Sequence, residues 1–127
     1  MDKIKSIYVA APWLRKTEAK EARKKLEEAG FTVTSGWVDI PDDEDRDEAY
    51  MREQALNDYS DVFAAQALVL LNLEKSEGKA VETGLALATN MPILLVGERT
   101  NIFHWLPEVN IVGSVEEAII YLQNYGV

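Results

Sequence analysis

The residues best suited to chemistry follow the pattern Ser76-x-Gly78-x-x-x-Glu82, which begins with a short turn of small and polar residues. The turn follows an apolar run and precedes a helical pattern, so its backbone N–H groups and the positive end of the helix dipole face the same edge of a predicted sheet. Gly78 lets a ligand approach the backbone closely. Glu82 follows in the first turns of the helix. These residues predict a site for an anionic ligand beside a carboxylate, although an N-cap serine, a turn glycine and an exposed glutamate explain the same pattern.

The elements around this turn are predicted from hydrophobic periodicity. Five consecutive apolar residues at 67–71 indicate a buried strand. The helix after the turn rests on Val81, Leu85 and Ala88, and Asn90 and Pro92 signal its end. The remaining predicted elements are strands at 4–10, 31–35, 92–96 and 109–112, helices at 15–29 and about 47–64, a helical turn at 102–105, and a last helix capped by Ser114 with Glu117.

The alternation of strands and helices predicts an α/β domain with a parallel sheet. We expect a single-domain, flavodoxin-like, doubly wound five-stranded sheet in the order 2-1-3-4-5, covering residues 1–127. Its switch point lies between strands 1 and 3, so the turn after Ala10 and the turn at Ser76 flank one crevice. Tyr8 lies near the end of the first strand, where it is either a core tyrosine or a phenol that orients Glu82.

Two further helix features are expected. The helix at about 47–64 carries Ala55, Tyr59, Val62 and Phe63 on one apolar face. Asp58 falls one residue off that stripe in mid-helix, and surface placement is its default explanation, because a buried carboxylate is costly unless it is paired.

Charge and composition exclude several classes of protein. With 22 acidic and 13 basic residues, the net charge of −9 opposes binding to nucleic acid polymers and to anionic membrane surfaces. The chain has no cysteine, which fits a reducing compartment. No apolar run approaches 18 residues, and the first residues lack the apolar core of a secretory signal. We expect a cytoplasmic domain that binds a small molecule.

Seven acidic residues crowd positions 39–48. A solvated loop is the plain interpretation and a metal site is the sharper one, but the spacing matches no EF-hand. We expect neither a metal nor an organic cofactor. The sole histidine, His104, sits between aromatic residues and is interpreted as a packing or rim residue in preference to a catalyst.

Several of these motifs, in this order, resemble the nucleoside 2-deoxyribosyltransferase family, especially its compact phage-type and bacterial members. The resemblance covers nearly the whole chain. It lies in the segments Tyr8-Val9-Ala10-Ala11-Pro12-Trp13, Val33-Thr34-Ser35-Gly36-Trp37, Asn57-Asp58, Gly78-Lys79-Ala80-Val81-Glu82-Thr83-Gly84, Asn101-Ile102-Phe103-His104-Trp105-Leu106-Pro107 and Glu116-Glu117-Ala118.

The resemblance implies roles for particular residues. Glu82 falls on the family nucleophile, which attacks the anomeric carbon of a 2-deoxyribosyl group. Asp58 falls on the carboxyl that contacts the sugar or protonates the departing base, and Tyr8 on the tyrosine that holds the nucleophile. Ser76 and Gly78 match the turn that holds a 5′-phosphate in the related deoxynucleotide N-hydrolases. Relatives of this kind are homo-oligomers, so the resemblance implies a dimer or higher.

The turn after the first strand is expected to bind substrate through Ala11, Pro12 and Trp13. Ala11 replaces the glycine of the family pattern, and Trp13 is the best candidate among the three tryptophans to stack on a base. Two departures are noted. Gln66 stands where many relatives carry aspartate, and Lys79 near the helix start hints at a phosphate.

Several alternatives stay open on the sequence. The enzyme could be a hydrolase or a transferase, and its substrate a nucleoside or a 5′-monophosphate with any base. A non-catalytic nucleotide sensor using the same crevice is a second hypothesis. An interaction protein working through the acidic segment is a third.

Overall fold

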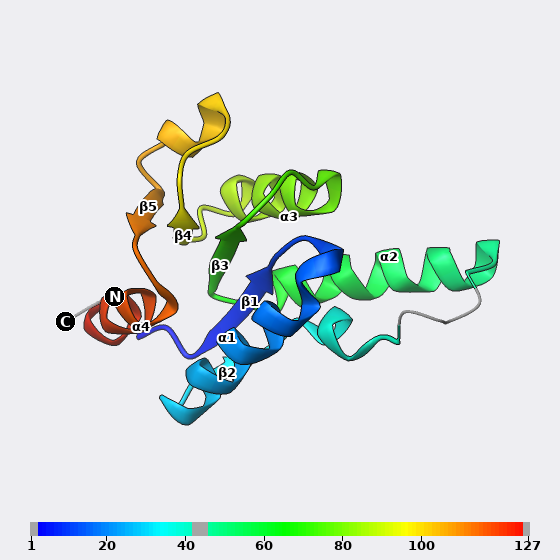
Figure 1. Cartoon of the computed structure of the whole chain (residues 1–127), viewed down its shortest axis with the longest axis horizontal. Helices are drawn as coiled ribbons and strands as arrows, with labels where there is room; N and C mark the ends of the chain where they lie inside the picture. The colour runs from blue at the N-terminus through cyan, green and yellow to red at the C-terminus, as the bar shows by residue number, and fades with distance from the viewer. Residues whose placement is uncertain (1–2, 42–45, 126–127) are drawn as a thin grey trace.

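The computed structural model describes residues 3–41 and 46–125, and within these ranges five parallel strands form one sheet in the order β2-β1-β3-β4-β5 (Figure 1). The predicted fold class and strand order are therefore confirmed. In chain order the elements are β1 (Ser6–Ala10), the 3₁₀ turn η1 (Trp13–Arg15), α1 (Lys16–Glu28), β2 (Thr32–Val33), the 3₁₀ turn η2 (Gly36–Asp39), α2 (Glu48–Phe63), β3 (Ala67–Asn72), α3 (Glu77–Ala88), β4 (Ile93–Gly97), the 3₁₀ turn η3 (Ile102–Trp105), β5 (Val109–Val112) and α4 (Val115–Asn124).

The central pair of strands, β1 and β3, sets the position of the predicted crevice. Tyr8 is paired with Leu68 and Ala10 with Leu70, so the chain leaves both strands at the same edge of the sheet. Residues 67–71 of β3 are all buried, which is typical of a strand covered by helices on both faces. The turn at 73–76 and the turn after Ala10 therefore flank one another, as the topology predicts.

Helices cover both faces of the sheet. α1 packs with α4 on one face, and α2 packs with α3 on the other (Figure 1). The first and last helices each bury an apolar face, with Ala19, Ala22 and Leu26 buried in α1 and Ala118 and Leu122 in α4. Gly30, directly after α1, has a φ of 100°, which is the left-handed conformation of a helix-ending glycine.

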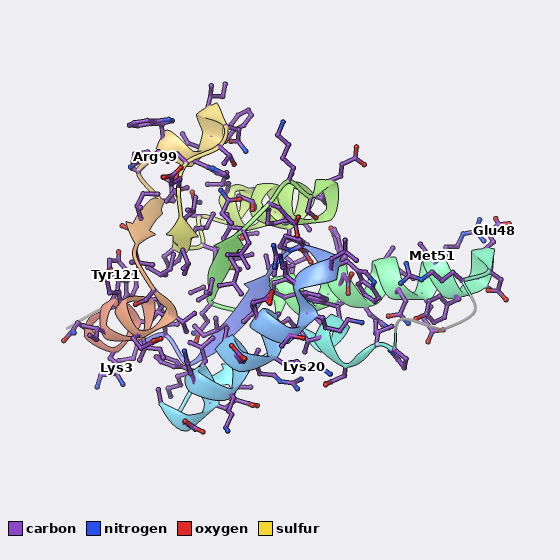
Figure 2. The ribbon with its side chains drawn as sticks, in the orientation of Figure 1. Lys3, Lys20, Glu48, Met51, Arg99 and Tyr121 are labelled. Atoms are coloured by element: carbon purple, nitrogen blue, oxygen red, sulfur yellow. The ribbon has the colours of Figure 1, made fainter. Side chains whose placement is uncertain are left out.

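The apolar face predicted for α2 is wrong. Val62 is fully buried, but Tyr59 and Phe63 are 52% and 42% exposed, and Ala55 is exposed as well. The helix runs outward past the sheet, and Figure 2 shows Met51 and Glu48 at the end far from the other elements. Only its last turns meet the core, so a stripe drawn along the whole helix does not become a packing face.

Two predicted strands are shorter than expected. β1 begins at Ser6 rather than at residue 4, and β2 covers two residues instead of 31–35. Side chains replace the missing sheet contacts. The Ser35 hydroxyl accepts a hydrogen bond from Val9 N at 3.1 Å, and the Thr34 hydroxyl donates to Asp61 O at 2.7 Å.

Polar side chains form hydrogen bonds to backbone N–H groups at the start of β1 and at the start of α4. Gln66 accepts hydrogen bonds from the backbone N–H groups of Lys5 and Ser6, at 2.7 and 3.2 Å, which gives this departure from the family pattern a structural role. Ser114 caps α4 by accepting from Glu117 N at 3.1 Å. The Glu117 carboxylate accepts from Gly113 N rather than from the cap residue, so the predicted capping box is shifted by one residue.

Among the described residues, no helix has the length and apolar character needed to cross a membrane. Four of the seven acidic residues at 39–48, those at positions 42–45, fall outside the described residues. Within the described ranges, no group of histidine, cysteine and acidic side chains is arranged to hold a metal ion.

Candidate active site

A small cavity lies at the switch point of the sheet, between the end of β1 and the first turns of α3. Its volume is about 110 Å³. It is lined by Ala11, Trp13, Trp37, Asp58, Ser76, Gly78, Lys79 and Glu82. Five of the predicted site residues thus meet around one cavity, together with Asp58, which the periodicity had placed on the surface.

Glu82 and Tyr8 are joined by a hydrogen bond at the base of this cavity. The Tyr8 hydroxyl donates to Glu82 Oε2, and its ring is fully buried beneath α3. The second carboxylate oxygen, Oε1, has no hydrogen-bond partner among the described residues. This arrangement fixes the carboxylate by one oxygen and leaves the other to face a ligand.

The environment of this pair favours neutral forms. Burial raises the pKa of Glu82 to about 8, the hydrogen bond from Tyr8 works in the opposite direction, and the nearby Asp58 charge adds to the rise. Burial, and then the Glu82 charge, raise the pKa of Tyr8 well above its usual range, so the phenol remains a donor. A carboxyl with such a raised pKa is typical of functional sites.

Asp58 faces the same cavity from α2. Burial raises its pKa to about 6, and the charge of Asp61 contributes to the rise. Its Oδ1 atom is buried and has no hydrogen-bond partner in the part of the chain that the structure describes. The surface interpretation of Asp58 is therefore wrong. Glu82 lies five residues after the start of α3, so the crevice extends past the first turn of that helix. At this depth α3 packs against α2, which places the mid-helix residue Asp58 close to Glu82.

Two tryptophans form an aromatic side of the cavity. The ring centroids of Trp13 and Trp37 are 6.1 Å apart and the rings are tilted by 34°. Trp37 is buried and its indole N–H donates to Val9 O at 2.9 Å. Trp13 is partly exposed, and the Lys16 ammonium and the Arg46 guanidinium lie over its ring, at 3.7 and 4.6 Å from the centroid.

Ala11 and Pro12, which the sequence predicts to bind substrate, take different positions in the turn between Ala10 and η1. Ala11 lines the cavity, whereas Pro12 is buried behind it, where its carbonyl accepts from Arg15 N at 2.9 Å. Pro12 therefore shapes the turn and is not among the cavity-lining residues. Trp105, in contrast, is 70% exposed on η3.

The first turn of α3 forms the rim. Ser76 caps the helix, with its hydroxyl accepting from Lys79 N at 3.2 Å, and Gly78 lines the cavity without a side chain. The Lys79 ammonium turns into the protein, where it donates to Asn72 Oδ1 at 2.7 Å and to Glu74 O. Burial lowers the pKa of Lys79. Its protein partners account for this buried cation without a phosphate.

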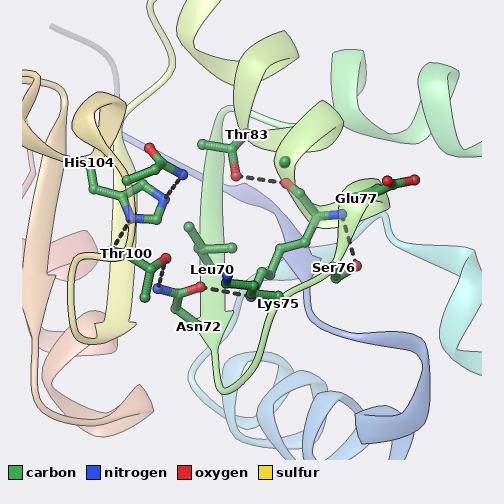
Figure 3. A pocket seen from close by; sticks show the side chains of 11 residues that line it. Leu70, Asn72, Lys75, Ser76, Glu77, Thr83, Thr100 and His104 are labelled. Carbon is green, nitrogen blue, oxygen red and sulfur yellow. Dashed lines mark hydrogen bonds between the residues drawn. The ribbon is translucent and has the colours of Figure 1, made fainter.

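A second cavity of about 270 Å³ lies on the other side of the same turn (Figure 3). Asn72 there donates to Thr100 Oγ1 at 3.0 Å, and His104 Nδ1 accepts from Thr100 N at 3.0 Å. Burial, then Lys79 and Arg99, lower the pKa of His104. His104 is buried in the connection between β4 and β5 and does not line the cavity that holds Glu82. His104 is therefore a packing residue, as its aromatic neighbours in the sequence indicate.

Comparison with known proteins gives a fold relationship. No family model matches the chain, and no curated protein sequence matches it. Among solved structures, a 2-deoxyribosyltransferase from the psychrotolerant bacterium Bacillus psychrosaccharolyticus has a TM-score of 0.69 and 19% identity, covering 94% of this chain and 91% of that one. The chain has the fold of a 2-deoxyribosyltransferase.

Two other solved structures have the same fold. The CMP N-glycosidase of Clostridium botulinum has a TM-score of 0.62 at 20% identity, and covers 95% of this chain with the whole of its own. A conserved protein from Enterococcus faecalis V583 has a TM-score of 0.58 at 18% identity, covering 94% of this chain and 97% of that one. The enzymes named among these structures are of the kind that the sequence motifs resemble.

Sequence reasoning missed Trp37, which lines the cavity, and Asp61, which lies outside the cavity lining and accepts a hydrogen bond from Gly36 N. Trp37 was one of three candidate tryptophans and not the favoured one, and its position depends on the side-chain contacts that replace β2. Asp61 belongs to none of the motifs that the sequence analysis singled out. Its three-residue spacing from Asp58 on one helix is the pattern that could have indicated a shared face.

Proposed function

We propose that this protein cleaves or transfers the N-glycosidic bond of 2′-deoxynucleosides or their 5′-monophosphates, with Glu82 as the nucleophile. The observation that carries the proposal is that Glu82 and Asp58 line one cavity at the switch point of the sheet, with Tyr8 hydrogen-bonded to Glu82. The fold shared with a 2-deoxyribosyltransferase and an N-glycosidase supports the same reaction class.

The chemistry follows from the residue types. Breaking the bond between the anomeric carbon and the base nitrogen builds positive charge on the sugar, which the Glu82 carboxylate stabilises. Its free Oε1 forms an ester with the anomeric carbon as the electron pair of the broken bond leaves with the base. Tyr8 holds the other oxygen throughout.

Asp58 is assigned the proton transfer. In its neutral form it gives a proton to the departing base and becomes a carboxylate. That carboxylate then takes a proton from the attacking water in hydrolysis, or from an incoming base in transfer. The ester breaks, and the glutamate returns as a carboxylate. The division of labour between two carboxyls parallels that of retaining glycosidases, with a nucleobase as the leaving group.

The rim and walls supply binding groups. Ser76 and Gly78 are assigned to the sugar 5′ end and any phosphate on it, where the N-terminus of α3 favours negative charge. Trp13 and Trp37 are assigned to the base through stacking. Ala11 faces the sugar, and Pro12 fixes the turn that carries these residues.

We further propose that the protein is a homo-oligomer. Large apolar side chains stand exposed beside α3 and on η3, including Val81 at 62%, Ile102 at 77% and Phe103 at 58% exposure. Of these three, Phe103 lines an apolar groove of about 540 Å³ between α3 and η3. Contiguous exposed apolar surface of this kind is typical of protein–protein contacts. Sedimentation at several concentrations tests this, and a monomer at every concentration would contradict it.

The test of the proposed reaction is direct. The protein is incubated with purine and pyrimidine deoxynucleosides and their 5′-monophosphates, with and without an acceptor base, and released base is measured by chromatography. We expect base release that Glu82→Ala abolishes and that Glu77→Gln, an exposed change on the same helix, leaves intact.

Base release from none of these substrates, or release unaffected by Glu82→Ala, contradicts the proposal. Tight nucleotide binding without turnover would instead identify a non-catalytic sensor. Release that depends on an acceptor base identifies a transferase, and release into water alone identifies a hydrolase.

A further inference from the structure

The turn that carries Trp37 is held to the rest of the site by side-chain hydrogen bonds. Thr34 Oγ1 donates to Asp61 O at 2.7 Å, and Gly36 N donates to Asp61 Oδ2 at 3.1 Å. On the other side, Ser35 Oγ accepts from Val9 N, and the Trp37 indole donates to Val9 O. The turn is thus fastened to α2 through Asp61 and to β1 through Val9.

Asp61 also lies on the same side of α2 as Asp58. The two are three residues apart, which places them on one face of a helix, and both are partly buried while Tyr59 and Ser60 between them are exposed. The Asp61 carboxylate is fixed by Gly36 N, and a side chain at Gly36 would approach Asp61 Oδ2 to 3.4 Å. Its negative charge is therefore held at a defined place beside Asp58.

We propose that Asp61 is a positioning residue of this site, which anchors the turn that carries Trp37 and holds a negative charge beside Asp58. The inference rests on the proposed function. In that reaction Asp58 is the acid, and Asp61 is its charged neighbour outside the substrate cavity.

Other groups around Asp58 define the electrostatic balance. Glu82 on α3 adds negative charge, the Tyr8 phenol on β1 stays neutral, and the Lys79 ammonium on α3 is turned away towards Asn72 and Glu74. Among the causes that raise the pKa of Asp58, burial comes first and the Asp61 charge second. Removing that charge while keeping the geometry isolates the contribution of Asp61.

Asp61→Asn does this, because the amide oxygen can still accept from Gly36 N. Asp61→Ala removes the charge together with the hydrogen bond from Gly36 N, and keeps the backbone carbonyl that accepts from Thr34. Glu53→Gln, an exposed change on α2, removes one charge away from the site and serves as the control. The side-chain carboxyl of Asp58 is titrated by carbon NMR in all four proteins, with Asp58→Asn identifying the resonance.

We expect the midpoint of Asp58 to fall by at least about half a pH unit in Asp61→Asn and to stay unchanged in Glu53→Gln. In the pH profile of base release, the acid limb of Asp61→Asn moves to lower pH and the maximum falls several-fold, because less of the singly protonated pair carries its proton on Asp58. Asp61→Ala additionally raises KM, because the turn that carries Trp37 loses the hydrogen bond from Gly36 N to the Asp61 carboxylate.

An Asp58 midpoint in Asp61→Asn equal to that of the wild type overturns the inference, and so does an Asp61→Ala protein with an unchanged KM. The titration needs no turnover. A wild-type protein that releases no base therefore contradicts the proposed function, while the coupling between Asp61 and Asp58 is still decided by the titration.

Discussion

Replacing Glu82 by glutamine should make the protein more stable at neutral pH. The carboxyl of Glu82 is partly buried, and its pKa is raised from 4.5 to about 8. A raised pKa in the folded state means that folding favours the protonated form, so the stability is intact below pH 4.5 and is lost as the pH rises through about 8. Glutamine stays neutral throughout this window and still accepts the Tyr8 hydrogen bond through its amide oxygen.

The magnitude follows from the shift. The difference of about 3.5 units (8 − 4.5) corresponds to roughly 4 to 5 kcal/mol once the carboxyl is fully ionised, at about 1.4 kcal/mol per unit. Between pH 5 and pH 7 this group alone lowers the free energy of unfolding by about 2 to 3 kcal/mol. For a domain of this size, that is a fall in Tm of about 10 °C.

The assay is thermal unfolding of the ligand-free protein from pH 5 to pH 8. Wild type should lose Tm steadily, and Glu82→Gln should keep only the smaller slope contributed by Asp58, so that the gap between them widens with pH. Glu77→Gln, at an exposed position on the same helix, should follow the wild type. Parallel curves for Glu82→Gln and wild type would refute the reasoning, because they would show a carboxyl that ionises freely in water.

Three further outcomes are expected. Base release by the wild type should follow a bell-shaped pH profile with limbs near about 6 and about 8, because the reaction needs one proton shared between Asp58 and Glu82; a profile flat from pH 5 to 9 contradicts this. Tyr8→Phe should move the upper limb to higher pH, because the hydrogen bond from Tyr8 lowers the pKa of Glu82 and its loss raises that pKa, and should reduce kcat by about 10- to 100-fold; an unmoved limb with full activity excludes the phenol from the site. Lys79→Met should cost about 1 to 3 kcal/mol in urea unfolding, because Asn72 Oδ1 and Glu74 O lose their donor; unchanged stability would show that water replaces it.

The sheet and the rim of the site could be predicted because they depend on local patterns. An apolar run such as 67–71 followed by Ser76 and Gly78 defines a strand, a cap and a helix start within one stretch of chain, and the strand order then brings Tyr8 beside that helix. The contact between Tyr8 and Glu82 could be predicted from these elements and from the side of the sheet or helix on which each residue lies.

Asp58 and Asp61 could not be placed in the same way. Their position depends on where α2 crosses the sheet and how far it extends past it, which periodicity along one helix does not contain. The misassigned face at Tyr59 and Phe63 has the same origin, since most of α2 lies beyond the core. The short β2 depends on hydrogen bonds from Thr34 and Ser35 to distant backbone atoms, and these carry no local signal.

The most direct test of the account is to trap the ester on Glu82. The protein is mixed with a 2-deoxy-2-fluoroarabinosyl nucleoside, or its 5′-monophosphate, because the fluorine destabilises positive charge on the sugar and slows release from the enzyme. The digested protein is then mapped by mass spectrometry. We predict that one glycosyl unit is attached to the peptide that contains Glu82, and that none is attached in Glu82→Gln. Base release without an adduct, or an adduct on a different residue, would contradict the assignment of Glu82 as the nucleophile.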